Sequence, residues 1–130
     1  MKNVKLKMKN DKEKFKNDFK KKVYCFILEL IRFIDKLPKD TSSQIFAKQI
    51  LRSGTSIGAN YIEAQAASSK KDFINFFHHS LKSANETKFW LALLKDSKKA
   101  NPRDAEKLLD ILTEIANILA SSILTLKGKK

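Results

Sequence analysis

Residues 15–38 read FKNDFKKKVYCFILELIRFIDKLP, and this stretch decides the fold. Its large apolar residues recur every three or four positions, which places them along one side of a helix. They are Phe15, Phe19, Val23, Phe26, Leu30, Phe33 and Leu37. Because Pro38 has no N–H to donate, it stops the helix. We therefore predict a helix over residues 14–37.

Three further stretches show helical periodicity, and they predict helices over residues 41–66, 70–96 and 102–127. Residues typical of helix starts stand at each beginning: Thr41 with Gln44, Ser69 with Asp72, and Asn101 before Pro102. With 3 Gly and 2 Pro, the chain has too few turn residues for a sandwich or barrel. Short connections make neighbouring helices antiparallel. The prediction is an all-α, up-down-up-down four-helix bundle over residues 14–127.

Positive charge is concentrated at the two ends of the chain. Residues 1–22 hold ten lysines against three acids, a formal charge of +7 out of +13. Residues 1–13 lack apolar periodicity and are predicted to form a flexible basic arm, with residues 128–130 as a basic tail. The lysines proposed for nucleic-acid contact are Lys12, Lys14, Lys16, Lys20, Lys21, Lys22, Lys127, Lys129 and Lys130. Solubilising tails, or an arm on an acidic membrane surface, are the alternatives.

The chain has 24 Lys and 3 Arg, which limits how it would bind a nucleic acid. Lysine neutralises phosphates but lacks the guanidinium group that reads bases in a bidentate manner. Binding is therefore expected to depend on the phosphate backbone and to weaken with salt.

The sequence predicts neither an enzyme nor a metal site. The adjacent His78 and His79 diverge by about 100° on a helix, so they do not easily ligate one ion. No Glu-x-x-His pattern, phosphate loop or nucleophile elbow occurs. We expect no cofactor. The single cysteine, Cys25, lies in an apolar run and is predicted to be a small core residue rather than a reactive thiol.

No apolar stretch in residues 1–22 is suited to a secretion signal. The strongest membrane candidate, residues 23–34, is too short to span a bilayer and contains Glu29 and Arg32. We expect a protein without a membrane span, located in the cytoplasm.

Residues 53–60 read SGTSIGAN and have low helix propensity. They form either a loop or a helical segment in which Gly54 and Gly58 let another backbone approach closely. We favour the helix, because Ile50, Ile57 and Tyr61 keep helical spacing through it.

Polar residues near this segment are candidates for a structural network, a subunit interface or a ligand site. They are Arg52, Ser56, Asn60, Glu63 and Glu86. Unpaired buried charges are costly, so pairing across helices or subunits is the favoured interpretation. Phe89 and Trp90 are interpreted as core or interface anchors rather than base-stacking platforms.

The same region resembles a bacterial four-helix bundle family that includes proteins encoded by intervening sequences within 23S ribosomal RNA genes. The resemblance spans roughly residues 24–126 and rests on Arg52-Ser53, Ser56-Ile57, Ala59-Asn60, Glu63-Ala64, Ser69, Asp72-Phe73, Ala84, Glu86-Thr87 and Trp90-Leu91. It implies a homopentameric barrel of bundles. A related branch, the accessory variability protein of diversity-generating retroelements, works with a reverse transcriptase and nucleic acid.

Two functions follow as hypotheses. One is a non-catalytic oligomer that associates with nucleic acid, RNA being favoured by the family context. The other is a protein–protein adaptor or structural scaffold whose basic ends are incidental. A reverse transcriptase or another protein is a further candidate partner.

Overall fold

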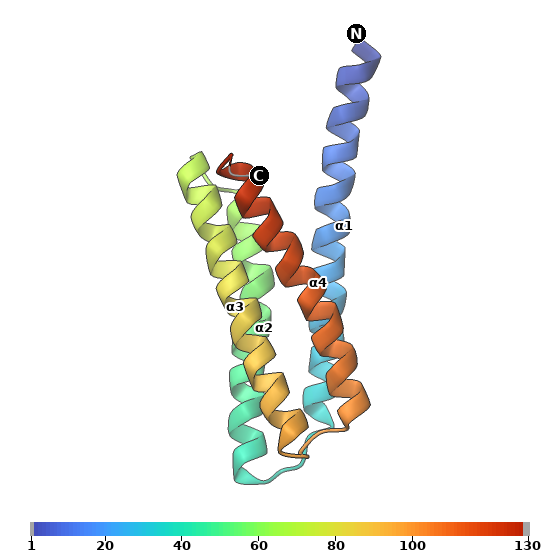
Figure 1. Ribbon diagram of the computed structural model, residues 1–130, viewed down its shortest axis with the longest axis vertical. Helices are drawn as coiled ribbons and strands as arrows, with labels where there is room; N and C mark the ends of the chain where they lie inside the picture. The colour runs from blue at the N-terminus through green and yellow to red at the C-terminus, as the bar shows by residue number, and fades with distance from the viewer. Residues whose placement is uncertain (1, 129–130) are drawn as a thin grey trace.

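The structure is a computed structural model that describes residues 2–128, and within them the side chains of residue 7 and residues 9–128. It contains four helices: α1 (Lys2–Asp35), α2 (Thr41–Gln65), α3 (Lys70–Asp96) and α4 (Pro102–Leu126). No strand occurs in this part of the chain. The helices lie side by side, with the first turns of α1 extending beyond the other three (Figure 1). The predicted all-α four-helix bundle is confirmed.

Contacts between helices give their relative directions. From α2 to α3, Ser53 bonds Thr87 and the carbonyl of Ile57 bonds Ser80, so residue numbers rise in one helix as they fall in the other. From α1 to α4, Lys22 pairs with Glu114 and Glu29 approaches Lys107. These helix pairs run in opposite directions, as the colours in Figure 1 also show.

The apolar stripes of the sequence form the core. Every member of the first stripe from Phe19 to Leu37 is buried, although Leu37 lies just beyond the end of α1, and Leu30 is fully enclosed. Burying one such side chain contributes roughly 1.5–3 kcal/mol. Phe15 is the exception, because it is 56% exposed. The core on the α1 side therefore begins one turn later than the sequence predicts.

The beginning of α1 differs from the prediction. Residues 2–13, predicted to be a flexible arm, continue α1 as regular helix, so the helix begins twelve residues before the expected position 14. The prediction of a flexible arm rests on the lack of apolar periodicity in these residues. That lack shows that the segment has no face to pack against a core, but it does not exclude a helical backbone. Lysine has good intrinsic helix propensity, and no Gly or Pro interrupts these residues.

The helix starts follow their capping residues at α3 and α4. Ser69 Oγ accepts from the N–H of Asp72 at 3.1 Å, and Asn101 Oδ1 accepts from the N–H of Arg103 at 2.9 Å. At α2 the structure places the cap position at Asp40, with Thr41 already helical. Gln44 Nε2 donates instead to the carbonyl of Lys39, at 2.8 Å.

Of two local predictions, the helical segment 53–60 is confirmed and the burial of Cys25 is not. The segment 53–60 is helical, so α2 is continuous and the loop interpretation is wrong. Cys25 is exposed, so its prediction as a core residue is also wrong. Cys25 precedes Phe26 by one position, or about 100° around the helix, which turns it away from the core face.

Candidate functional site

A line of buried hydroxyl groups joins α2 to α3. Thr87 Oγ1 lies 2.8 Å from Ser53 Oγ and 2.8 Å from the carbonyl oxygen of Ser83. Farther along the same boundary, Ser80 Oγ donates to the carbonyl of Ile57 at 2.8 Å. Ser53, Ser80 and Thr87 are fully buried. Their small side chains allow the two helices to lie close together, and their hydroxyls find partners there.

The charged pair of the predicted polar set lies beside this line. The guanidinium of Arg52 pairs with Glu86 Oε2 across the α2–α3 boundary and also donates to Gln49 Oε1 at 2.9 Å. Trp90 Nε1 donates to the same Glu86 oxygen at 3.0 Å. The Arg52 and Glu86 side chains are 59% and 37% exposed, so water screens the pair. The pair orients Trp90 more than it stabilises the bundle.

The other three predicted polar residues do not take part in this ion pair. Asn60 Nδ2 donates to the carbonyl and the hydroxyl of Ser56, at 2.9 and 3.1 Å, within α2. Ser56, Asn60 and Glu86 share the wall of an open groove of about 460 Å³ between α2 and α3. Glu63 is exposed near the end of α2 and does not line it. Four of the five residues lie on α2 and Glu86 lies on α3, and the five do not make one network.

Gly54 and Gly58 face α1. A Cβ atom at Gly54 would collide with Leu30 Cδ2. One at Gly58 would lie 3.1 Å from Ile27 Cδ1 and 3.5 Å from Val23 Cγ1. The glycines therefore mark close packing of α2 against α1 within the bundle.

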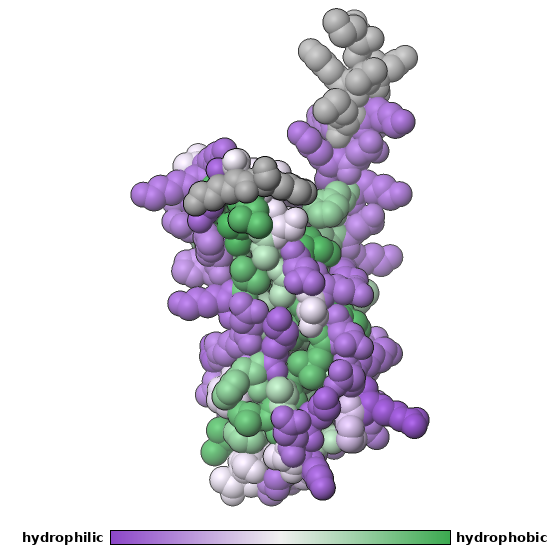
Figure 2. All heavy atoms as spheres, in the orientation of Figure 1, coloured by the Kyte–Doolittle hydropathy of each residue, from purple (hydrophilic) through white to green (hydrophobic). Residues whose placement is uncertain are grey.

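The candidate nucleic-acid lysines of α1 fall into three groups. Lys14 and Lys21 are exposed, and Lys20 borders a shallow groove between α1 and α2. Lys12 and Lys16 line a hollow at the end of the bundle. Lys22 pairs with Glu114 at 2.5 Å and is, within the described residues, the one lysine of α1 that pairs with a carboxylate. In Figure 2, the coloured part of α1 that projects beyond the other helices is mostly hydrophilic.

Lys127 lies at the end of α4, where it borders a small groove with Lys70, Lys71 and His78. The sequence interpretation missed Lys70 and Lys71, which add positive charge to the end of the bundle from which α1 projects. Lys129 and Lys130 lie outside the described residues.

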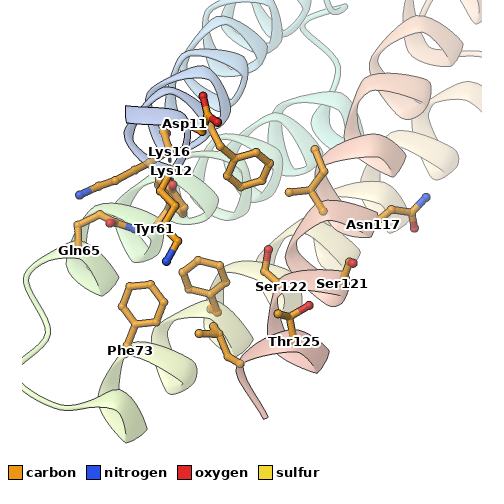
Figure 3. Close-up of a pocket in the computed structure, with 14 residues that line it drawn as sticks. Asp11, Lys12, Lys16, Tyr61, Gln65, Phe73, Asn117, Ser121, Ser122 and Thr125 are labelled. Carbon is orange, nitrogen blue, oxygen red and sulfur yellow. Dashed lines mark hydrogen bonds between the residues drawn. The ribbon is translucent and has the colours of Figure 1, made fainter. Parts of the chain in front are cut away.

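The hollow, of about 840 Å³, lies between residues 11–16 of α1 and the ends of the other three helices. Its walls include Phe15 from α1, Tyr61 from α2, Phe73 and Phe77 from α3, and Ile118 from α4. In Figure 3, the polar residues Asn117, Ser121, Ser122 and Thr125 of α4 lie across it from the residues of α1 and α2. Tyr61 Oη donates to the carbonyl of Lys16 at 3.3 Å, and burial raises the pKa of this phenol. The sequence reasoning did not find this site, because its residues are far apart in the chain.

A second apolar surface, the α1–α2 apolar face, consists of exposed residues along the junction of these helices. They are Tyr24, Leu28 and Ile31 of α1 and Leu51 and Ile62 of α2, which are 38–64% exposed. Tyr24 and Ile62 border the same shallow groove. Large exposed apolar side chains that cluster in this way are typical of contact surfaces.

Among the described residues, no group of three or more His, Cys, Asp or Glu side chains is placed to hold a metal ion. One helix, α4, has the length and mean hydropathy of a membrane-spanning segment. In the bundle, its buried side chains pack in the shared core: Ala105, Leu108, Leu112, Ile115, Ala116, Leu119 and Ile123.

Comparison with known proteins adds to this geometry. None of the curated proteins compared matches the chain. A crystal structure of a protein of unknown function from the S23 ribosomal protein family of Bacteroides thetaiotaomicron superposes with a TM-score of 0.77 at 40% sequence identity. The match covers 83% of this chain and 96% of that one. Residues 16–121 match the family described as 23S rRNA-intervening sequence protein. The chain therefore belongs to the 23S rRNA-intervening sequence protein family.

Proposed function

We propose that this chain is a non-catalytic, cytoplasmic, oligomeric bundle protein that associates with nucleic acid, RNA being favoured, through its phosphate backbone. The observation that carries the proposal is the helical, lysine-rich extension, which is residues 2–21 of α1. Its described lysines before Lys22 have no carboxylate partner among the described residues. They are therefore available to displace counterions from a phosphate chain.

The extension supports binding by shape as well as by charge. A helix rises about 1.5 Å per residue, so residues 2–13 extend roughly 18 Å along its axis. Lysines on several sides of this helix meet phosphates without requiring a specific base sequence. The family match begins at residue 16, so most of the extension lies outside it. RNA is favoured by the family context and not by the lysines themselves.

Self-association is the second part of the proposal. The α1–α2 apolar face offers an apolar surface to another copy, and the family resemblance implies five copies. In a pentamer, five basic extensions would act together, and multivalency would raise the apparent affinity without any new interaction. Light scattering with mass determination tests this part. A mass near five times 14.9 kDa is expected, and a monomeric mass would contradict it.

A salt series tests nucleic-acid binding. Affinity for an RNA oligonucleotide is measured at salt concentrations from about 50 to about 200 mM by fluorescence anisotropy, and it should fall steeply. Replacing Lys9, Lys14 and Lys21 by Ala should reduce the slope of log affinity against log salt by about 0.7–0.9 for each lysine that neutralises a phosphate. The same substitution of Lys36, Lys39 and Lys48, which are exposed elsewhere, is the matched control and should leave the slope unchanged.

The alternative is a protein–protein adaptor or scaffold, and the α1–α2 apolar face favours it. Absence of RNA binding at low salt, in a protein with the expected oligomeric mass, would reject the nucleic-acid proposal and support this one. A slope reduced equally by both triple variants would show that overall charge, rather than the extension, drives binding.

A further inference from the structure

The hollow marks a place where the core is incomplete. Phe15 belongs to the apolar stripe of α1 by its spacing, yet it is 56% exposed at the wall of the hollow. Phe73 and Leu126 are also partly exposed there. An occupant that covers these side chains would gain apolar contact that the chain alone does not supply.

Aromatic rings form one side of this space. Phe73 and Phe77 lie with ring centroids 4.8 Å apart, and Phe77 lies 5.6 Å from Tyr61. Tyr61 in turn meets Phe19 edge-on at 4.9 Å, which joins the cluster to the core. The inner rings are therefore held in place by packing, while Phe15 and Phe73 remain accessible. Accessible rings on a fixed support are what a planar, aromatic group stacks upon.

Hydrogen-bonding side chains form the opposite side. Asn117, Ser121, Ser122 and Thr125 come from successive turns of α4 and border the hollow (Figure 3). An amide and three hydroxyls can both donate and accept hydrogen bonds. Asn117, Ser121 and Thr125 are exposed, so water satisfies them in the free protein, and the polar edge of a nucleobase would replace that water.

Two lysines complete the site. Lys12 and Lys16 border the same hollow, and Asp11 offsets one of their charges, so the margin stays positive. Nearby, Lys70, Lys71 and Lys127 border a neighbouring groove. Stacking rings beside a positively charged margin are the combination by which proteins bind single-stranded nucleic acids.

We propose that the hollow accepts an unstacked base from a single-stranded nucleic acid, with Lys12 and Lys16 contacting the flanking phosphates. This inference rests on the proposed function and adds that the preferred strand is unpaired. A fully paired duplex would offer its phosphates to the extension but would keep its bases away from the hollow.

The experiment compares two probes of equal length and charge: a fluorescein-labelled ten-nucleotide uridine strand and a ten-unit strand that lacks bases. At a fixed low salt concentration, the base-bearing strand should bind roughly 10-fold more tightly, because stacking of one base on an aromatic side chain has an effect of this order. Phe15→Ala should remove most of this difference without weakening binding of the strand that lacks bases. The matched control is Phe89→Ala, because Phe89 is 57% exposed and does not border the hollow.

The outcomes separate the two proposals. If neither probe binds, both the nucleic-acid function and the base site are rejected. If both probes bind equally, or if Phe15→Ala and Phe89→Ala behave alike, the base site is rejected while phosphate binding stands. A Phe15→Ala variant that loses oligomeric mass would assign the hollow to a second copy of the chain, which also overturns the base site.

Discussion

Gly54 of α2 lies directly against Leu30 of α1, with no room between them for a methyl group. Leu30 is fully buried, so its side chain cannot swing into solvent to make space. We expect Gly54→Ala to lower the free energy of unfolding by about 1–2 kcal/mol, because overpacking outweighs the roughly 1 kcal/mol that alanine adds to helix propensity. Urea unfolding followed by circular dichroism measures the change.

Gly58→Ala is the matched comparison for Gly54→Ala. Its nearest neighbour would be the end of the Ile27 side chain, at 3.1 Å, and Ile27 is only partly buried. We expect a change between zero and a gain of about 1 kcal/mol, since the neighbour can yield. Equal destabilisation by the two substitutions would contradict this interpretation of the packing.

The hydroxyl pair of Ser53 and Thr87 should be energetically coupled. Thr87→Val removes the hydroxyl that is hydrogen-bonded to Ser53 Oγ in a fully buried site, and we expect it to cost about 1–2 kcal/mol. Ser53→Ala should cost less, because Thr87 keeps its bond to the carbonyl of Ser83. A double-mutant cycle should give a coupling energy of at least about 0.5 kcal/mol. Simple additivity would mean that the pair contributes little.

Glu86 should affect the spectrum of Trp90 more than the stability of the fold. Trp90 is the only tryptophan, and its indole N–H donates to Glu86 Oε2. Glu86→Gln should shift its fluorescence emission while changing the free energy of unfolding by less than about 1 kcal/mol, since the ion pair with Arg52 is partly exposed. The control is Glu114→Gln, which removes a different interhelical pair, with Lys22, and should leave the emission unchanged.

The connection before α2 should be sensitive to acid. Asp40 receives Lys99 Nζ at 2.9 Å and the hydroxyl of Ser42 at 3.0 Å. The neighbouring Ser43 hydroxyl, although outside strict hydrogen-bond geometry, is the largest cause that holds the pKa of Asp40 well below its ordinary 3.8, and Lys99 is the next.

Because the folded state lowers this pKa, the contribution of Asp40 to stability is complete above about pH 4 and is lost as the pH falls further. Thermal unfolding measured from about pH 6 down to about pH 2 should show a smaller decline for Asp40→Asn than for the unchanged protein. Parallel pH profiles for the two proteins would contradict the assignment.

Most of the fold follows from periodicity and capping. The predicted ranges for the second, third and fourth helices end within one residue of the observed α2, α3 and α4. Large apolar residues at helical spacing, preceded by N-capping residues, favour a helix over other conformations for these segments. The beginning of α1 does not follow in this way, because its helix is stabilised by intrinsic propensity without a packed face. Cys25 shows the opposite error, since its apolar neighbours suggest burial while its direction on the helix places it outside.

The candidate site could be predicted only in part. Arg52 and Glu86 stand out in the sequence as charges near apolar residues, and the structure places them in contact. The hollow could not be derived, since Phe15, Phe73 and Thr125 meet only through the arrangement of three helices. Spacing within one helix does not reveal which residues of different helices lie close together. Glu63 shares a helix face with Arg52, but eleven positions along α2 separate them, which is about 16 Å at the helical rise.

Because α1 is continuous, its lysine-rich end is a rigid rod rather than a flexible linker. Each helical position before Phe19 has a fixed angle around the axis relative to the core residues that follow it, because successive residues turn by about 100°. One residue inserted between Lys16 and Phe19 would rotate the whole cationic segment by that angle and leave its composition almost unchanged. A flexible segment would bind its partner equally well after this insertion. A rigid helix would instead present a different set of lysines to the partner.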